Sequence, residues 1–170
     1  MSGYVYLKGD AETAYVALQS ADGRVEYCRK EISGLGTEWK RFDFGMTPDA
    51  TDNNARFVVA LGGEGSMWVD MAVLHTESYP YRADLTQDFI NERLTFLRYG
   101  GTMINAPEYR VKNMMGPRDK RPPYKGHWYR YSTNGFGIIE FVDFARKIGT
   151  EPTFSINIED DPQDVLALLE

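Results

Sequence analysis

The spacing of apolar residues changes once along the chain, between residues 76 and 82. Before this segment the chain consists of short strand-like runs separated by turn signals. After it, apolar residues recur at helical spacing and alternate with short, continuous apolar runs. The chain is therefore predicted to contain two parts of different architecture, residues 1–76 and residues 77–170.

Residues 1–76 predict an antiparallel β-sandwich of the jelly-roll type. Asp22-Gly23 tolerates positive φ in a tight hairpin, and Gly62-Gly63-Glu64-Gly65 can also reverse the chain. The expected strands cover residues 4–8, 13–20, 25–33, 38–45, 55–61 and 67–74. Jelly rolls have about eight strands, so these six predict a partial sandwich.

Residues 77–170 predict consecutive β/α units. We expect helices over residues 84–94, capped by Asp84, and over residues 137–148, ended by Gly149. Buried parallel strands are expected over residues 94–99 and 151–158, and Asp161-Pro162 predicts the start of a last helix. Two strands, where a closed barrel needs about eight, predict a partial (β/α)8 TIM barrel.

A polar, proline-rich stretch over residues 102–133 separates the first of these strands from the second helix. A connection of this length inside a compact domain is usually functional or disordered. It also holds the one basic cluster of the sequence, interpreted here as a solvated loop that balances an acidic protein. The cluster consists of Arg118, Lys120, Arg121, Lys125 and Arg130.

Composition excludes several classes of function. The net charge of −6 over 170 residues provides no basic surface for nucleic acid. The longest apolar runs are far too short to cross a bilayer, so no membrane partner is expected. The first residues carry no signal-peptide pattern, and a chain with Cys28 as its one cysteine is compatible with both the cytoplasm and secretion.

No metal site and no cofactor are predicted. His75 and His127 are more than fifty positions apart and have no third ligand at metal spacing. His75 is interpreted as a surface residue at the junction of the two parts, and His127 as a residue at the rim of a pocket.

Several separated motifs occur in order in the second part. They are Trp68-Val69-Asp70-Met71, then the run LRYGGTMINAPEYRVKNMMGPRDKRP from Leu97, then Trp128, STNGFGIIEF from Ser132, and GTEPTFSINI from Gly149. From Met67 to Glu170 this series resembles the α-L-arabinofuranosidases of glycoside hydrolase family 51. Gly34-Leu35 and Glu38-Trp39-Lys40 resemble the carbohydrate-binding-like sandwich that many of these enzymes insert into their barrel.

The resemblance implies that residues 94–99 and 153–158 are the second and third strands of the catalytic barrel. Substrates of such barrels bind at the carboxyl ends of the strands, and the residues implied to bind the sugar are Gly101, Thr102, Trp128 and Asn134. Two positions depart from the family pattern: Val111 replaces a tryptophan, and Tyr99 stands where many members have proline. Both departures concern the shape of the pocket.

The resemblance also implies that both catalytic glutamates lie outside this chain, which predicts that the chain alone is inactive. Glu159, Asp160 and Asp161 follow the last strand and are the candidate substitutes, but Asp161 is better explained as a helix cap and Glu159 as a solvated loop residue. Glu140 is expected within a helix, where it faces solvent or pairs with a neighbouring cation.

Three hypotheses follow. The chain is a segment of a retaining, exo-acting α-L-arabinofuranosidase that removes terminal arabinofuranosyl groups from arabinoxylan or arabinan. Alternatively, it is a non-catalytic carbohydrate-binding protein that holds an arabinose-containing plant polysaccharide or oligosaccharide. In the third case it is an incomplete piece of a longer coding sequence without a function of its own. Unpaired strand edges predict that the isolated chain is marginally stable or self-associates.

Overall fold

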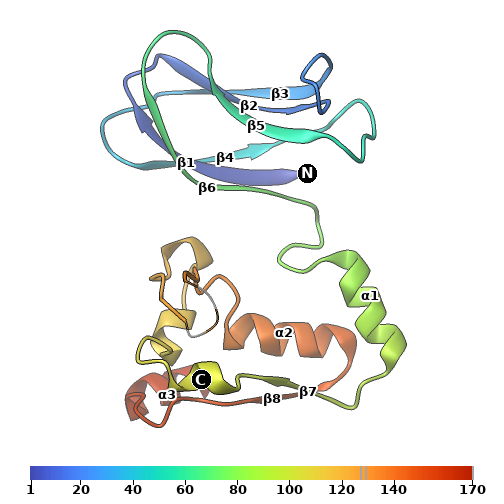
Figure 1. Cartoon of the computed structure of the whole chain (residues 1–170), viewed down its shortest axis with the longest axis vertical. Helices are drawn as coiled ribbons and strands as arrows, with labels where there is room; N and C mark the ends of the chain where they lie inside the picture. Colours follow the sequence, from blue (N-terminus) through green and yellow to red (C-terminus); the bar gives the residue numbers. More distant parts are fainter. Residues whose placement is uncertain (127, 129, 170) are drawn as a thin grey trace. The chain divides into compact units, whose positions relative to one another are not determined.

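In the computed structural model, which describes residues 1–126, 128 and 130–169, the chain divides into two units, Met1–Tyr79 and Pro80–Glu170. Most of its regular structure is β-strand, and the α-helices lie in the second unit (Figure 1). Among the described residues no helix is long and apolar enough to span a membrane.

The first unit consists of two three-stranded antiparallel sheets. One sheet has the order β4-β1-β6, formed by Lys40–Gly45, Ser2–Gly9 and Met67–His75. The other has the order β3-β2-β5, formed by Glu26–Ser33, Thr13–Gln19 and Arg56–Leu61. All six predicted strands are confirmed, each beginning and ending within two residues of the expected position.

The two sheets share one apolar core. Val5 and Leu7 on β1 and Val16 on β2 are fully buried, because alternate side chains of each strand point toward the facing sheet. The rings of Phe44 on β4 and Phe57 on β5 stack at 6.0 Å between centroids and so join the two sheets. The first unit is therefore a β-sandwich.

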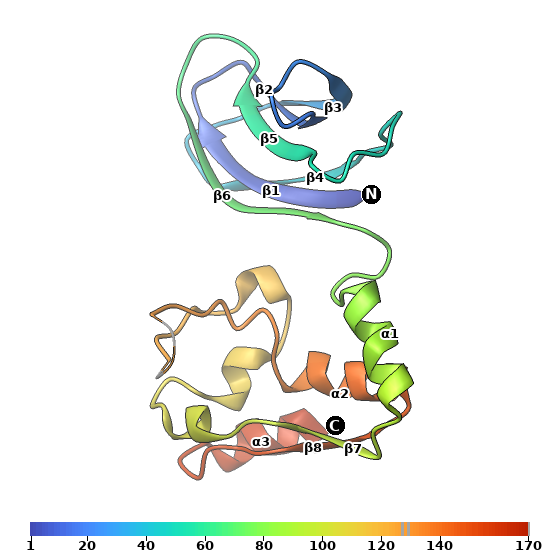
Figure 2. The ribbon, with the colours of Figure 1, turned by 45° about the vertical axis from the view of Figure 1, so that its right-hand side comes forward.

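The second unit is built on two parallel strands, β7 (Phe96–Tyr99) and β8 (Glu151–Phe154), with Phe96 beside Glu151 and Tyr99 beside Phe154. Its helices are α1 (Ala83–Glu92), α2 (Ile138–Ile148) and α3 (Pro162–Leu169). Figure 2 shows β7 and β8 side by side with α2 lying along them.

Helix α2 covers one face of this small sheet. It buries Ile138, Phe141 and Ala145, which lie on one side of the helix as predicted, and the Phe141 ring stacks on Tyr99 at 5.3 Å. Gly149 ends the helix in the left-handed conformation with φ 75°, which confirms the predicted stop.

Two predicted boundaries are wrong. Arg82 occupies the N-cap position of helix α1 without a capping side-chain hydrogen bond, and Asp84 lies within the first turn, where its carboxylate pairs with the Arg82 guanidinium. Strand β8 ends at Phe154, four residues before the expected end. Beyond β8 the chain forms a local turn, in which Asn157 Oδ1 accepts a hydrogen bond from the Glu159 N–H (2.9 Å).

The long connection after β7 is folded. It contains three short 3₁₀ helices, η1 (Thr102–Asn105), η2 (Val111–Met114) and η3 (Arg118–Lys120). Tyr109, Val111 and Met114 are buried there and form the core of the second unit together with Ile138. The loop is therefore held by packing of its own apolar side chains.

Candidate functional site at the ends of β7 and β8

The carboxyl ends of β7 and β8 lie at one edge of the parallel pair. The Ser155 N–H donates to the Tyr99 carbonyl (3.1 Å), which continues the pairing of the two segments just past β8. In α/β folds this edge is where ligands bind, since loops of different β/α units meet there. The edge is therefore the candidate site, and the loop of residues 102–137 forms most of its surroundings.

Two glycines lead out of β7 with backbone conformations that favour glycine. Gly100 has φ 115°, and a Cβ on it would lie 3.1 Å from the Ser155 Cβ. Gly101 has φ 120° and ψ −150°, a region that side chains exclude. They place Thr102 at the start of η1, where it is exposed.

The loop is anchored to the end of β8 by buried polar contacts. The Tyr109 hydroxyl donates to the Ser155 carbonyl (3.3 Å), and burial raises the pKa of this hydroxyl well above its usual range. The Asn157 amide donates to the Ala106 carbonyl (3.3 Å). Nothing in the sequence singled out Tyr109 or Asn157, because each acts on a residue about fifty positions away.

All three carboxylates after β8 are engaged in structural contacts. Asp160 is buried, and its Oδ1 accepts from the Val111 N–H (3.2 Å). Glu159 pairs with Arg110 (3.1 Å) and has a largely exposed side chain, as expected for a solvated loop residue. Asp161 accepts from the Gln163 N–H (2.8 Å), which confirms it as the cap of α3.

Glu140 and Arg121 form a buried ion pair. Of the two alternatives for Glu140, pairing with a cation is confirmed and facing solvent is wrong, and the basic loop is not fully solvated. Arg121 Nη2 lies 2.7 Å from Glu140 Oε1, and Nη1 lies 2.8 Å from Oε2. Glu140 Oε2 also accepts from the Gly137 N–H (2.9 Å), which closes the first turn of α2.

This pair has a clear electrostatic consequence. Burial alone would raise the pKa of Glu140, but the hydrogen bonds from Arg121 and from the Gly137 N–H outweigh burial and hold the pKa below its ordinary value. A general acid of a glycosidase needs a raised pKa. Glu140 is therefore suited to hold the loop and unsuited to protonate a leaving group.

The structure places the four residues implied to bind sugar in different surroundings. Gly101 and Thr102 lie at the end of β7. Trp128 is 71% exposed on the loop. Asn134 is 3% exposed with φ 55°, and its amide donates to the Pro122 carbonyl (2.7 Å).

Of the two histidines, the structure describes His75. His75 stacks on Tyr79 at 4.1 Å, in the first unit. His127 lies outside the described residues. Over the described ranges, no three His, Cys, Asp or Glu side chains are grouped closely enough to hold a metal ion.

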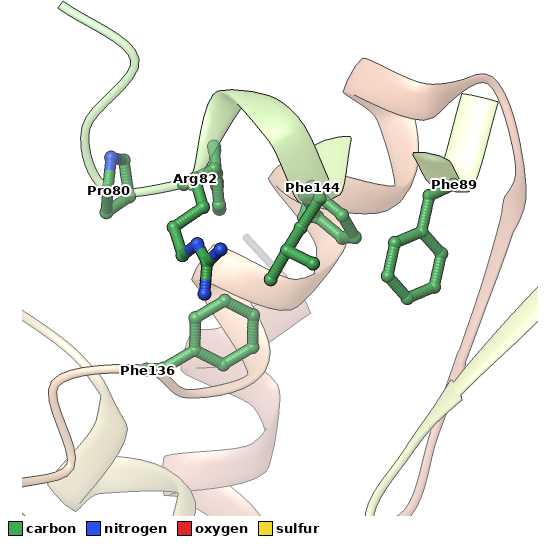
Figure 3. Close-up of a pocket in the computed structure, with 7 residues that line it drawn as sticks. Pro80, Arg82, Phe89, Phe136 and Phe144 are labelled. Carbon is green, nitrogen blue, oxygen red and sulfur yellow. The ribbon is translucent and has the colours of Figure 1, made fainter. Parts of the chain in front are cut away.

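The second unit also has a hollow between α1 and α2. It measures about 180 Å³, and Figure 3 shows Phe89, Phe136 and Phe144 around it, with the Arg82 side chain extending toward Phe136. Phe89 meets Phe144 edge-on at 5.4 Å, the geometry of packed aromatic rings. Because its lining is almost entirely apolar, we interpret this hollow as packing between the two helices.

Comparison with known proteins places these elements in a family context. Residues 90–164 match the family model described as "Alpha-L-arabinofuranosidase 1 domain". The chain is 28% identical over 167 residues to α-L-arabinofuranosidase 1 of Arabidopsis thaliana and 26% identical to α-L-arabinofuranosidase 2 of the same plant. Each alignment covers 91% of this chain, which spans about a quarter of the relative's length (24% and 25%).

A solved structure has a similar fold. The arabinose-bound α-L-arabinofuranosidase MgGH51 superposes with a TM-score of 0.68 at 21% identity, over 90% of this chain and 28% of that one. The family model and the two plant relatives agree: the chain is similar to α-L-arabinofuranosidases.

Proposed function

We propose that the chain is part of a retaining, exo-acting α-L-arabinofuranosidase that hydrolyses terminal α-L-arabinofuranosyl groups of arabinoxylan or arabinan. The observation that carries this proposal is the match over residues 90–164, which includes β7, the folded loop, α2 and β8. These elements surround the edge where α/β enzymes bind their substrates. Arabinose-containing plant polysaccharides or oligosaccharides are the substrates proposed.

In this proposal residues 77–170 form two neighbouring β/α units of a (β/α)8 barrel, and residues 1–76 form a partial carbohydrate-binding-like sandwich. The parallel register of β7 and β8 supports the barrel, as does the helix between them. Helix α2 covers one face of the pair, while Phe96, on the opposite face, is 66% exposed. Further strands of a barrel would enclose that face.

Within this site, Gly101, Thr102 and Trp128 are the residues proposed to contact the sugar. Thr102 offers a hydroxyl at the strand end, and the flat indole of Trp128 can cover the C–H face of a furanose ring. Asn134 is proposed to act indirectly, because its amide is already bound to the Pro122 carbonyl. It would shape the loop that carries Trp128.

We further propose that the isolated chain has no glycosidase activity. Retaining hydrolysis needs an acid and a nucleophile about 5 to 5.5 Å apart. Among the described residues near the strand ends, Glu140, Glu159, Asp160 and Asp161 each have a structural partner. None of them is free to serve in such a pair.

Two assays test the proposal. The chain alone should release no nitrophenol from p-nitrophenyl α-L-arabinofuranoside above a heat-denatured control. A chimera in which this chain replaces the matching stretch of α-L-arabinofuranosidase 1 of Arabidopsis thaliana should hydrolyse the same compound. A chimera that melts cooperatively and has no activity would argue against the proposal.

The second candidate function is carbohydrate binding without catalysis. The exposed Trp128 and the engaged carboxylates favour it for the chain by itself. Binding of an arabino-oligosaccharide by the chain, together with an inactive chimera, would select this function.

A further inference from the structure

Two tryptophans of the first unit are exposed beside one lysine. Trp39 is 45% exposed and Trp68 is 56% exposed. The Lys8 Nζ lies 5.0 Å from the centre of the Trp39 ring and 5.7 Å from the centre of the Trp68 ring. The three side chains therefore form one continuous patch, called here the Trp39–Lys8–Trp68 surface.

The register of the sheet explains why they meet. Lys8 on β1 is the direct partner of Trp68 on β6. On the other side of β1, Leu7 pairs with Lys40, the first residue of β4, which brings the preceding Trp39 level with Lys8. Neighbouring strands are about 4.8 Å apart, so the two indoles stand roughly 10 Å apart on the outer face of the sheet.

The patch borders a hollow of about 290 Å³ whose lining combines apolar surface with a few polar groups. Lys8, Gly9, Asp10, Thr37 and Trp68 line it. Two hydrogen bonds hold its rim: the Gly9 N–H donates to the Gly36 carbonyl (2.8 Å), and the Asp10 carboxylate oxygen Oδ1 accepts from the Ser66 N–H (2.6 Å). Gly9 also permits the close approach of Ser66, whose carbonyl oxygen would lie 2.2 Å from a Cβ at this position.

We propose that the Trp39–Lys8–Trp68 surface binds a carbohydrate chain. A sugar ring has an apolar C–H face that stacks on an indole and a rim of hydroxyls that hydrogen-bond to ammonium, carboxylate and hydroxyl groups. This surface supplies both kinds of group from Trp39, Trp68, Lys8, Asp10 and Thr37. Because each indole covers about one ring, two indoles at this spacing contact different sugars of one chain.

The lysine between the rings argues against a protein partner. Centres of protein interfaces are depleted of lysine, since burying an ammonium without a counter-charge is unfavourable. A hydroxylated ligand leaves the ammonium hydrated or gives it oxygen acceptors. The proposal does not depend on the site at β7 and β8, and it assigns the sandwich a role in holding a polysaccharide.

The test uses the full chain and affinity gel electrophoresis with two soluble polymers, arabinoxylan and debranched arabinan, together with free L-arabinose. Wild type should be retarded by at least one polymer, whereas free L-arabinose should compete weakly. Trp39→Ala and Trp68→Ala should each weaken retardation about ten-fold, the size expected for losing one aromatic contact. Trp39→Phe should keep most of the binding, because a smaller ring still stacks.

Tyr15→Ala is the matched control. Tyr15 also carries a cation over its ring, with the Arg29 guanidinium at 3.9 Å, but it lies on the other sheet. Its removal should leave retardation unchanged. Failure of wild type to bind either polymer would overturn the proposal, as would equal binding by wild type and both alanine variants.

Trp128→Ala separates this proposal from the proposed function. If retardation is lost in Trp128→Ala and kept in Trp39→Ala and Trp68→Ala, sugar binds to the second unit. That result would overturn the present proposal and support the proposed function. A drop in self-association in Trp39→Ala without any binding to polysaccharide would identify the surface as a protein interface and would also overturn it.

Discussion

Arg121 and Glu140 form a buried, bidentate ion pair between the long loop and the first turn of α2, with N to O distances of 2.7 and 2.8 Å. The guanidinium also donates to the carbonyls of Gly116 and Asn134 (3.0 to 3.1 Å). Every strong contact of this arginine thus fixes the course of the loop that carries Trp128. The pair is the main electrostatic support of the candidate site.

Removing the carboxylate should destabilise the second unit strongly. Glu140→Ala leaves the Arg121 charge buried without a partner, a change that costs about 3 to 5 kcal/mol of unfolding free energy. Urea denaturation followed by circular dichroism measures this loss. Asp143→Ala on the exposed side of the same helix is the control and should change stability by less than about 0.5 kcal/mol. Equal effects of the two variants would contradict the structural role of the pair.

The pair also predicts a dependence of stability on pH. Because the folded state holds the pKa of Glu140 below its ordinary 4.5, the folded state binds the proton less readily than the unfolded chain. The stabilisation is therefore complete above the unfolded pKa and is lost as the pH falls through the folded one. Unfolding free energy measured from pH 6 downward should decline more steeply in wild type than in Glu140→Gln. Parallel profiles would count against the assignment.

The glycines after β7 should resist substitution for different reasons. Gly100→Ala combines positive φ with a close contact to Ser155, and Gly101→Ala meets positive φ alone. Each should cost about 1 to 3 kcal/mol. Gly45→Ala is the control, since a Cβ there meets nothing within 4 Å and its φ is ordinary. Thermal melts of the three variants test this. An unchanged melting temperature of Gly101→Ala would contradict the prediction and show that the strand end can relax.

Trp128→Ala should leave the stability of the chain nearly unchanged. The side chain is 71% exposed, so little packing is lost. Tyr109→Ala is the aromatic control within the same loop; it is fully buried and should cost about 3 to 5 kcal/mol. In the active chimera, Trp128→Ala should reduce turnover. A loss of several kcal/mol with turnover per folded molecule intact would assign Trp128 to packing.

The isolated chain should self-associate as its concentration rises. Phe96 and Ile158 expose large apolar surface in the second unit, Ile158 being 99% exposed. Phe96→Lys and Ile158→Lys should each lower the average mass measured by sedimentation velocity, because a charge opposes apolar contact. Val25→Lys, at an exposed position of the sandwich, should not. A monomeric wild type at all concentrations would refute this prediction.

Local chemistry was sufficient to predict most of the regular structure. The six strands of the sandwich follow from side-chain alternation and from turn residues such as Asp22-Gly23, which act over a few positions. Gly149 and Asp161 were correctly assigned as helix boundaries, since a left-handed glycine and a carboxylate cap are recognisable from their neighbours alone. The motifs around Arg98 and Trp128 were sufficient to indicate the similarity to α-L-arabinofuranosidases that the family model shows over residues 90–164.

Tertiary structure decided what depends on residues far apart in sequence. Tyr109 and Asn157 join the loop to the segment that follows β8, and their hydrogen-bond partners lie 46 and 51 positions away. The sequence around Glu140 is that of an ordinary helix. Only the fold brings Arg121 beside it from 19 positions away and buries both side chains. Likewise, Trp39 and Trp68 belong to distant motifs and meet across Lys8 because β1 pairs with both β4 and β6. Such pairings arise from chain topology, which local periodicity does not encode.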